Sequence, residues 1–210
     1  MTSRGESTRA RILDAAGSAF ARLGYDGASL TADILEPAAV STGSFYHQFP
    51  SKRALLTALL DEATDNLRQL LDGGHRTGPQ PDADGLLARA TAGWNLLLLA
   101  VDAAPDIALV VRREAHNRDP EIREAVARFN TLQREAFRAR LEELTVPGVD
   151  LDAVSRVVGA LAVGLVEEYL AIEPERRSAE RDRLAEEAAR FTLSGMPGMG
   201  ARPAGRTGGD

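Results

Sequence analysis

The sequence predicts an all-α protein of about nine helices, with an N-terminal three-helix domain ahead of a larger helical domain. Ala and Leu are abundant, aromatic residues make up only 5 % of the chain, and strand-forming runs of Thr, Tyr and Ile are missing. This composition favours helix over sheet. Apolar residues recur with helical spacing along most of the chain, and Gly and Pro interrupt that spacing at intervals. Together these observations indicate a series of amphipathic helices.

The segment before residue 72 predicts four helices. The first has an apolar stripe at helical spacing, which consists of Ile12, Ala16, Phe20 and Leu23. Gly24 ends this helix as a C-terminal cap would. Each of the next three helices follows a hydroxyl side chain that can cap its N-terminus. They are 32–37 after Ser29 or Thr31, 42–48 after Ser41, and a longer helix after Ser51.

The rest of the chain predicts five more helices. Residues 72–82 are rich in Gly, Pro and polar side chains and indicate a loop. Helical spacing then returns in the segments 87–101, 106–116, 120–144, 151–172 and 175–193. Residues 195–210 are rich in Gly and Pro, so we expect a disordered tail.

Charge and composition exclude several classes of protein. The net charge of the 210-residue chain is −6, but residues 1–60 carry six basic and five acidic residues, so the acidic excess lies beyond them. No cysteine is present, which excludes disulfides and thiolate metal sites. The start of the chain is polar, and the longest uncharged apolar run, Val157–Val166, is about half of what a bilayer needs. We therefore expect a cytoplasmic protein that does not bind membranes.

The sequence also argues against an enzyme. The three histidines are scattered, and we find no metal-binding pair, nucleophile motif or phosphate-binding loop. We expect no metal, no cofactor and no catalytic residues.

The segment from Asp33 to Lys52 carries the clearest functional signal. It predicts two short helices joined by a tight turn, and the second helix is too polar on one face to belong to a core. Hydroxyl, imidazole and amide groups on an exposed short helix suit hydrogen bonds to phosphates and base edges in a DNA major groove. The candidate DNA-binding residues are Thr31, Ser41, Thr42, Gly43, Ser44, Tyr46, His47 and Lys52.

Residues 8–60 resemble the DNA-binding domain of the tetracycline-repressor (TetR) family. The matching residues are Arg11-Ile-Leu-Asp-Ala-Ala16, Phe20, Gly24-Tyr25, Asp33-Ile34, Val40-Ser41-x-Gly43, Phe45-Tyr46-His47-x-Phe49 and Ser51-Lys52. The resemblance implies a repressor that binds a palindromic operator as a dimer and is released by a small-molecule effector. It also implies that the third helix enters the major groove and that Tyr46, His47 and Lys52 contact the DNA backbone.

The sequence departs from the family pattern in three places. Ala39 stands where the family turn usually has Gly, and Pro37 falls late in the second helix. The spacing from Tyr25 to Ile34 is one residue longer than usual. Pro37 lacks an N–H and should end or bend the helix, so we expect a different local geometry in this turn.

The candidate effector-binding residues are large or polar side chains of the second part of the chain. They are Trp94, Arg112, His116, Asn117, Phe129, Phe137 and Tyr169. Five of them also have a simpler interpretation: Trp94 as a core residue, Arg112, His116 and Asn117 as part of a charged network at a helix end over 112–119, and Tyr169 as a surface residue beside Glu167 and Glu168.

The helix over 151–172 is uncharged for ten residues, so it must be covered on more than one side. We therefore expect it and the last helix to form a dimer interface. The candidate interface residues are Val157, Ala160, Leu161, Gly164, Leu165 and Phe191. The expected domains are 1–48 for DNA binding, 51–194 for effector binding and dimerisation, and 195–210 as the tail. The alternative is a helical ligand-binding or scaffold protein without a DNA function.

Overall fold

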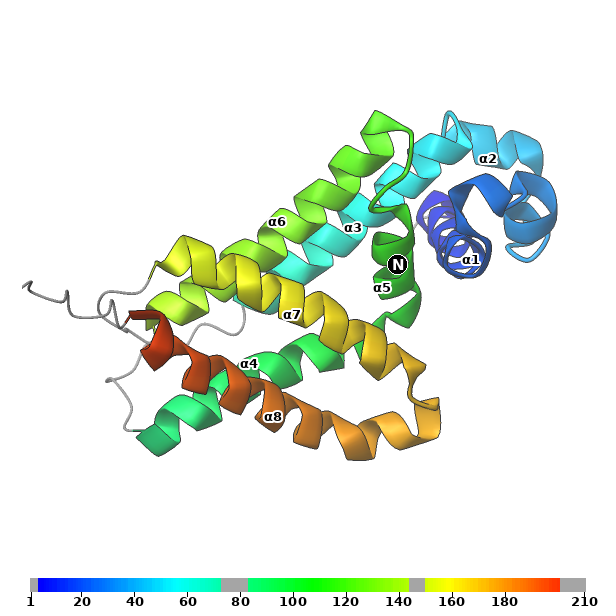
Figure 1. Ribbon diagram of the computed structural model, residues 1–210. Coiled ribbons are helices and arrows are strands. Elements are labelled where there is room, and N and C mark those ends of the chain that lie inside the picture. The colour runs from blue at the N-terminus through cyan, green and yellow to red at the C-terminus, as the bar shows by residue number, and fades with distance from the viewer. Residues whose placement is uncertain (1–3, 73–82, 144–149, 201–210) are drawn as a thin grey trace, which may run out of the picture. The chain divides into compact units, whose positions relative to one another are not determined.

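The computed structural model describes residues 4–72, 83–143 and 150–200, and in these ranges every regular element is a helix. The prediction of an all-α protein with about nine helices is confirmed. Their order and bounds (Figure 1) are α1 (Arg4–Gly27), η1 (Leu30–Leu35), α2 (Thr42–Gln48), α3 (Lys52–Asp72), α4 (Ala83–Ala103), α5 (Pro105–Glu114), α6 (Pro120–Glu143), α7 (Leu151–Ala171) and α8 (Pro174–Gly200).

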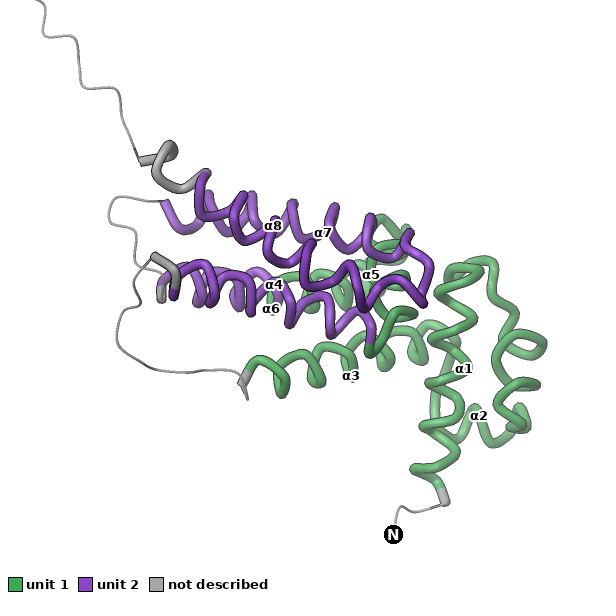
Figure 2. Tube along the Cα trace, turned by 90° about the horizontal axis from the view of Figure 1, so that it is seen from below, with its two compact units in different colours: residues 1–75, 103–132 green, residues 76–102, 133–210 purple. Residues whose placement is uncertain are grey.

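The chain forms two compact units, each of which combines segments that are distant in sequence (Figure 2). Unit 1 consists of Met1–His75 and Ala103–Leu132, and unit 2 of Arg76–Asp102 and Gln133–Asp210. Unit 1 therefore contains α3, α5 and the first half of α6 in addition to the three N-terminal elements α1, η1 and α2. Its limits differ from the domain boundary near residue 48 that the sequence suggests.

Unit 1 has one continuous apolar core, to which every one of its helices contributes. The predicted stripe of α1 is buried at Ile12, Ala16 and Phe20 and partly buried at Leu23. The core also takes residues from the other elements: Ile34 and Leu35 of η1, Phe45 of α2 and its C-cap residue Phe49, Leu55, Leu56 and Leu60 of α3, Val110 of α5, and Ile122 and Val126 of α6. Because Val110 of α5 and Ile122 and Val126 of α6 share one core with α1, η1 and α2, helices far along the chain stabilise the N-terminal helices.

Unit 2 is built from α4, the second half of α6, α7 and α8. Its buried residues include Trp94, Leu98 and Val101 of α4 and Leu141 of α6. On α7 and α8 the buried residues are mostly small, with the exception of the fully buried Tyr169. The expectation that Trp94 is a core residue agrees with its exposure of 4 %, whereas the expectation of a surface position for Tyr169 is wrong.

The last helix is longer than the sequence suggests. Its backbone is helical to Gly200, past the expected end near Leu193. Residues 201–210 of the predicted disordered tail, and most of the predicted 72–82 loop, lie outside the described residues.

Within the described residues, one helical segment, Gly85–Ala103, is long and apolar enough to cross a membrane, with a mean hydropathy of 1.2. A core helix of a soluble protein can be as long and as apolar, so a single such helix is weak evidence for a membrane span.

Candidate nucleic-acid interface

The short helix α2 presents a polar outer face and an apolar inner face. Ser41 caps its N-terminus, where the Ser41 hydroxyl accepts a hydrogen bond from the Ser44 backbone N–H at 3.2 Å. Six of the eight candidate DNA-binding residues form a continuous exposed surface on this cap and helix: Ser41, Thr42, Gly43, Ser44, Tyr46 and His47. Tyr46 is 56 % exposed although it is aromatic. The polar groups are therefore accessible to a partner.

Two phenylalanines hold the inner face of α2 in the core. Phe45 is fully buried and Phe49 is 3 % exposed, and their ring centroids lie 5.9 Å apart. The ring of Tyr46 meets the ring of Phe45 edge-on at 5.1 Å. This packing fixes how far Tyr46 can turn and keeps its hydroxyl on the outside.

The turn before α2 explains the three departures from the family pattern. The helix η1 is a π-helix, in which the Glu36 N–H donates to the Thr31 carbonyl five residues earlier. A π turn holds more residues than an α turn, so it accommodates the additional residue between Tyr25 and Ile34. The helix ends at Leu35 and is capped by Glu36, the residue before Pro37. Ala39 adopts a φ of 51°, the left-handed region in which Gly has no steric cost.

Thr31 and Lys52 are the other two candidate DNA-binding residues, and they flank the polar surface of α2. Thr31 is exposed on η1. The Lys52 ammonium donates to the carbonyls of Tyr25 at 2.7 Å and Ala28 at 2.9 Å, and it lies 4.6 Å from the centroid of the Tyr25 ring. Lys52 therefore holds together the link between α1 and η1, a role that its position in the sequence did not indicate.

The polar surface of α2 carries no acidic side chain. Between Glu36 and Asp61 the sequence has no acidic residue and carries His47, Lys52 and Arg53. The acidic excess of the whole chain therefore does not extend to α2 and the start of α3. Phosphate groups therefore meet no carboxylate on α2 itself, whereas Arg53 at the start of α3 is already paired with Asp119 and Glu121.

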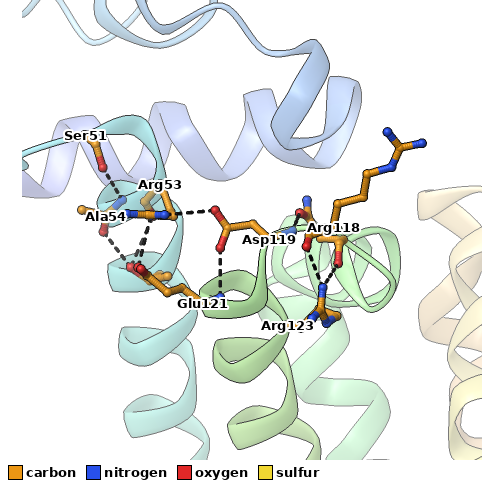
Figure 3. A network of polar contacts seen from close by, with 9 residues as sticks. Ser51, Arg53, Ala54, Arg118, Asp119, Glu121 and Arg123 are labelled. Carbon is orange, nitrogen blue, oxygen red and sulfur yellow. Dashed lines mark hydrogen bonds and ion pairs between the residues drawn. The ribbon is translucent and has the colours of Figure 1, made fainter.

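An ionic network fastens the start of α3 to the start of α6 within unit 1 (Figure 3). The Arg53 guanidinium pairs with Asp119 at 3.2 Å and with Glu121 at 3.1 Å, which raises the pKa of Arg53. Partial burial opposes ionisation of Asp119, but the Glu121 N–H and Arg53 stabilise its carboxylate and lower its pKa. Because α3 follows α2 directly, this network helps to position the polar surface.

A second set of contacts ties α5 to α1. Glu114 is only 3 % exposed, and its carboxylate accepts a hydrogen bond from the Tyr25 backbone N–H at 2.8 Å. The Ser18 hydroxyl donates to Asp106 at 2.7 Å, and Arg113 donates to the carbonyl of Arg22 at 3.1 Å. Sequence reasoning missed Glu114 because its partner is 89 residues away, and a single Glu in a charged segment gives no signal of burial.

The candidate effector-binding residues divide between the two units. Trp94 and Phe137 of unit 2 are in contact, with ring centroids 5.5 Å apart, and Tyr169 donates a hydrogen bond to Asp102 at 2.7 Å. The other four lie in unit 1, where Arg112 and His116 are exposed and Asn117 and Phe129 are partly buried. A cavity of about 370 Å³ beside α1 and η1 in unit 1 is lined by none of the seven.

The candidate dimer residues lie largely on an exposed face of unit 2. Val157 is 54 % and Phe191 is 67 % exposed, Ala160 and Gly164 are also exposed, and Leu161 and Leu165 are partly buried. Val157 and Phe191 are thus large apolar side chains accessible to a partner.

Known proteins resemble this chain in its N-terminal segment and over most of its length. Residues 12–59 match the model of the "Bacterial regulatory proteins, tetR family". The chain is 27 % identical to the HTH-type transcriptional regulator UidR of Escherichia coli K12 over 187 residues, which are 85 % of this chain and 90 % of UidR.

Solved structures show the same fold. GusR of Salmonella enterica superposes with a TM-score of 0.68 at 22 % identity, over 93 % of this chain and 98 % of GusR. FadR of Bacillus subtilis, solved in complex with stearoyl-CoA, superposes with a TM-score of 0.65 at 16 % identity, over 89 % and 98 % of the two chains.

Proposed function

Because the chain belongs to the tetR family of bacterial regulatory proteins, we propose that it is a cytoplasmic repressor that binds a palindromic operator through α2. The observation that supports this proposal most directly is the exposed hydroxyl, phenol and imidazole surface of α2, which Phe45 and Phe49 hold in one orientation from the core. A short helix with this outer face fits the major groove, where such groups bind base edges and phosphates.

The proposed roles of the individual residues follow from their positions. Tyr46 and His47 bind phosphates, whereas Thr42 and Ser44 lie in the first turn of α2, the part of a recognition helix that reaches base edges. Thr31, Ser41 and Gly43 border the same surface. Two carbonyls already accept hydrogen bonds from the Lys52 ammonium. Lys52 therefore has one N–H left to donate to a phosphate, and it also stabilises the link between α1 and η1.

A dimer gives the operator its symmetry. The proposed interface is the exposed apolar face of α7 together with Phe191 of α8. A two-fold dimer places two copies of α2 on half-sites that are related by the same symmetry, so the operator is a palindrome or close to one.

An effector releases the protein from the operator only if it binds the DNA-incompetent state more tightly than the DNA-binding state. FadR of B. subtilis, of the same fold, was solved with stearoyl-CoA, which supports a small-molecule effector for this chain. The proposed binding region is 51–194, behind a DNA-binding segment at 1–48. A typical coupling of about 1–3 kcal/mol lowers operator affinity by roughly 5–150-fold.

The test measures fluorescence anisotropy of labelled DNA from upstream of the gene. We expect Tyr46→Phe to weaken binding to all sequences about equally, since phosphate contacts carry no sequence information. Thr42→Ala and Ser44→Ala should instead change which base pairs are preferred. Gln69→Ala, on the exposed side of α3, is the control and should change neither.

Two results would contradict the proposal. If the wild-type protein bound upstream DNA no better than random DNA, the alternative of a helical ligand-binding protein without a DNA function would stand. If Tyr46→Phe changed base preference and left overall affinity intact, the assigned role of Tyr46 would be wrong.

A further inference from the structure

One side of α7 (Figure 1) carries a row of four exposed residues whose spacing is the same in both directions along the helix. The row consists of Arg156, Ala160, Val163 and Glu167. Successive members are four, three and four residues apart, which keeps them on one side of a helix with about 3.6 residues per turn. The row therefore has a positive charge at its N-terminal end, a negative charge at its C-terminal end, and two apolar side chains between them.

This symmetric spacing makes the row complementary to a second copy of itself. Suppose that a two-fold axis passes halfway between Ala160 and Val163 and that the two helices run antiparallel. Arg156 of each copy then lies level with Glu167 of the other copy. Ala160 lies level with Val163, which is 54 % exposed, so a small residue faces a larger one. Each contact occurs twice, as in any isologous interface.

The other charges on the exposed side of α7 favour this antiparallel direction. Glu168 is exposed beside Glu167, so the C-terminal end of the row carries two carboxylates. At the N-terminal end, Asp152 is already paired with Arg138 of α6 at 2.6 Å, and Arg156 is exposed. A parallel pair of helices would bring the glutamates of both copies together, and like charges at close range oppose association. An antiparallel pair instead brings the glutamates of one copy to the arginine of the other.

The positions that border the row suit close packing of a second helix. Val157 is 54 % exposed. At Gly164, an added Cβ would meet no heavy atom within 4 Å. A helix that packs on this side therefore meets apolar or small residues next to the row, and the charged residues remain at its two ends.

We propose that α7 pairs antiparallel with α7 of a second copy, in the register that places Arg156 beside Glu167 at both ends of the contact. This inference rests on the proposed dimer and specifies its direction and register. The apolar residues supply most of the affinity, because exposed ion pairs contribute little. The charges decide the direction and the register, because other arrangements bring like charges together.

The test mixes two charge-reversed variants, Arg156→Glu and Glu167→Arg. Each homodimer then has two like-charge contacts and should form roughly tenfold more weakly than the wild-type dimer. The heterodimer of the two variants has opposite charges at both contacts and should form as readily as the wild-type dimer. Native mass spectrometry of an equimolar mixture, with a mass tag on one variant, should therefore show more heterodimer than random pairing gives.

Controls separate this pairing from effects within one chain. Arg118→Glu mixed with Glu124→Arg reverses two exposed charges of unit 1 and should give random pairing. The excess of heterodimer should fall at about 1 M salt, where the Debye length is about 3 Å. Circular dichroism checks that the variants are folded. The double variant Arg156→Glu/Glu167→Arg restores both contacts in a homodimer, which keeps the test decisive if a single variant does not fold.

Introduced cysteines measure the direction of the helices, because the chain has none of its own. In the proposed register, two copies of residue 157 are separated by roughly 13 Å along the helix axis, too far for a disulfide. Val157→Cys should therefore not cross-link, whereas a mixture of Ala160→Cys and Val163→Cys should form a disulfide between the two variants.

Each remaining outcome contradicts a different part of the proposal. A wild-type dimer whose charge-reversed variants pair at random would overturn the register and leave the proposed dimer intact. Efficient cross-linking of Val157→Cys would show that the helices run parallel. A wild-type protein that is monomeric at micromolar concentration would overturn both the dimer and this inference.

Discussion

Unit 1 and unit 2 are both helical, but they differ in how many large apolar side chains they leave exposed. Unit 1 surrounds a core of large side chains such as Phe20, Phe45 and Leu55, and ionic and hydrogen-bonded contacts join its distant segments. In unit 2, large apolar residues such as Leu99, Val157, Val163 and Phe191 remain exposed. Unit 1 exposes Tyr46 and Leu70 among its large side chains, whereas the exposed apolar residues of unit 2 include candidates for the proposed dimer interface.

The largest effect is expected from a charge on the exposed face of α7. Gly164→Glu would bury an unpaired carboxylate in the proposed interface, which costs several kcal/mol, on the order of 3–5, and should dissociate the dimer. Sedimentation at micromolar concentration measures the change. Ala127→Glu, on an exposed position of α6, is the matched control and should leave the dimer intact. A wild-type protein that sediments as a monomer would rule out the dimer.

Glu114 tests whether unit 1 depends on its long-range polar contacts. Glu114→Leu leaves the Tyr25 N–H without its buried acceptor, which should lower the free energy of unfolding by about 2 kcal/mol. Glu114→Gln keeps one acceptor oxygen and should lose less. Urea unfolding followed by circular dichroism measures both variants. A Leu variant as stable as the wild type would mean that apolar packing alone holds α5 on α1.

Tyr169 makes the corresponding contact in unit 2 and adds a pH dependence. Burial and the hydrogen bond to Asp102 raise the pKa of Tyr169 to about 12. The folded protein therefore retains a proton that the unfolded chain loses near pH 10, so stability falls as the pH rises from about 10 to about 12.

Replacing this tyrosine tests both parts of the argument. Tyr169→Phe should lower the free energy of unfolding at neutral pH by about 1 kcal/mol and should weaken the alkaline loss. Urea titrations at several pH values compare it with the wild type. An identical alkaline loss in the two proteins would assign it to other groups.

The smallest effect is expected in the turn before α2. Ala39→Gly relieves the left-handed strain at a φ of 51°, and the greater freedom of Gly in the unfolded chain offsets part of the gain. The net result should be a stabilisation of about 0.5 kcal/mol, measured by thermal unfolding. Ala38→Gly is the control, because Ala38 is buried and has an ordinary φ, and it should destabilise the protein.

Local rules were enough to predict much of unit 1 from the sequence. The caps at Ser29, Ser41 and Ser51 are present, and α2 has the predicted bounds of 42–48 with Phe45 inside and Tyr46 outside. These features depend on residues within one or two helical turns, so their pattern can be read along the chain. The effect of Pro37 on the end of η1 is local in the same way.

Only the tertiary structure decided how the polar residues are used. Lys52 binds two carbonyls of the α1–η1 link, Arg53 pairs with residues of the α5–α6 segment, and Tyr169 is buried against Asp102 although it follows two glutamates. The physical reason is that the free energy of a polar side chain depends on partners that folding brings from 24 to 89 residues away. Helical periodicity predicts which face of a helix is apolar, but it carries no information about those partners.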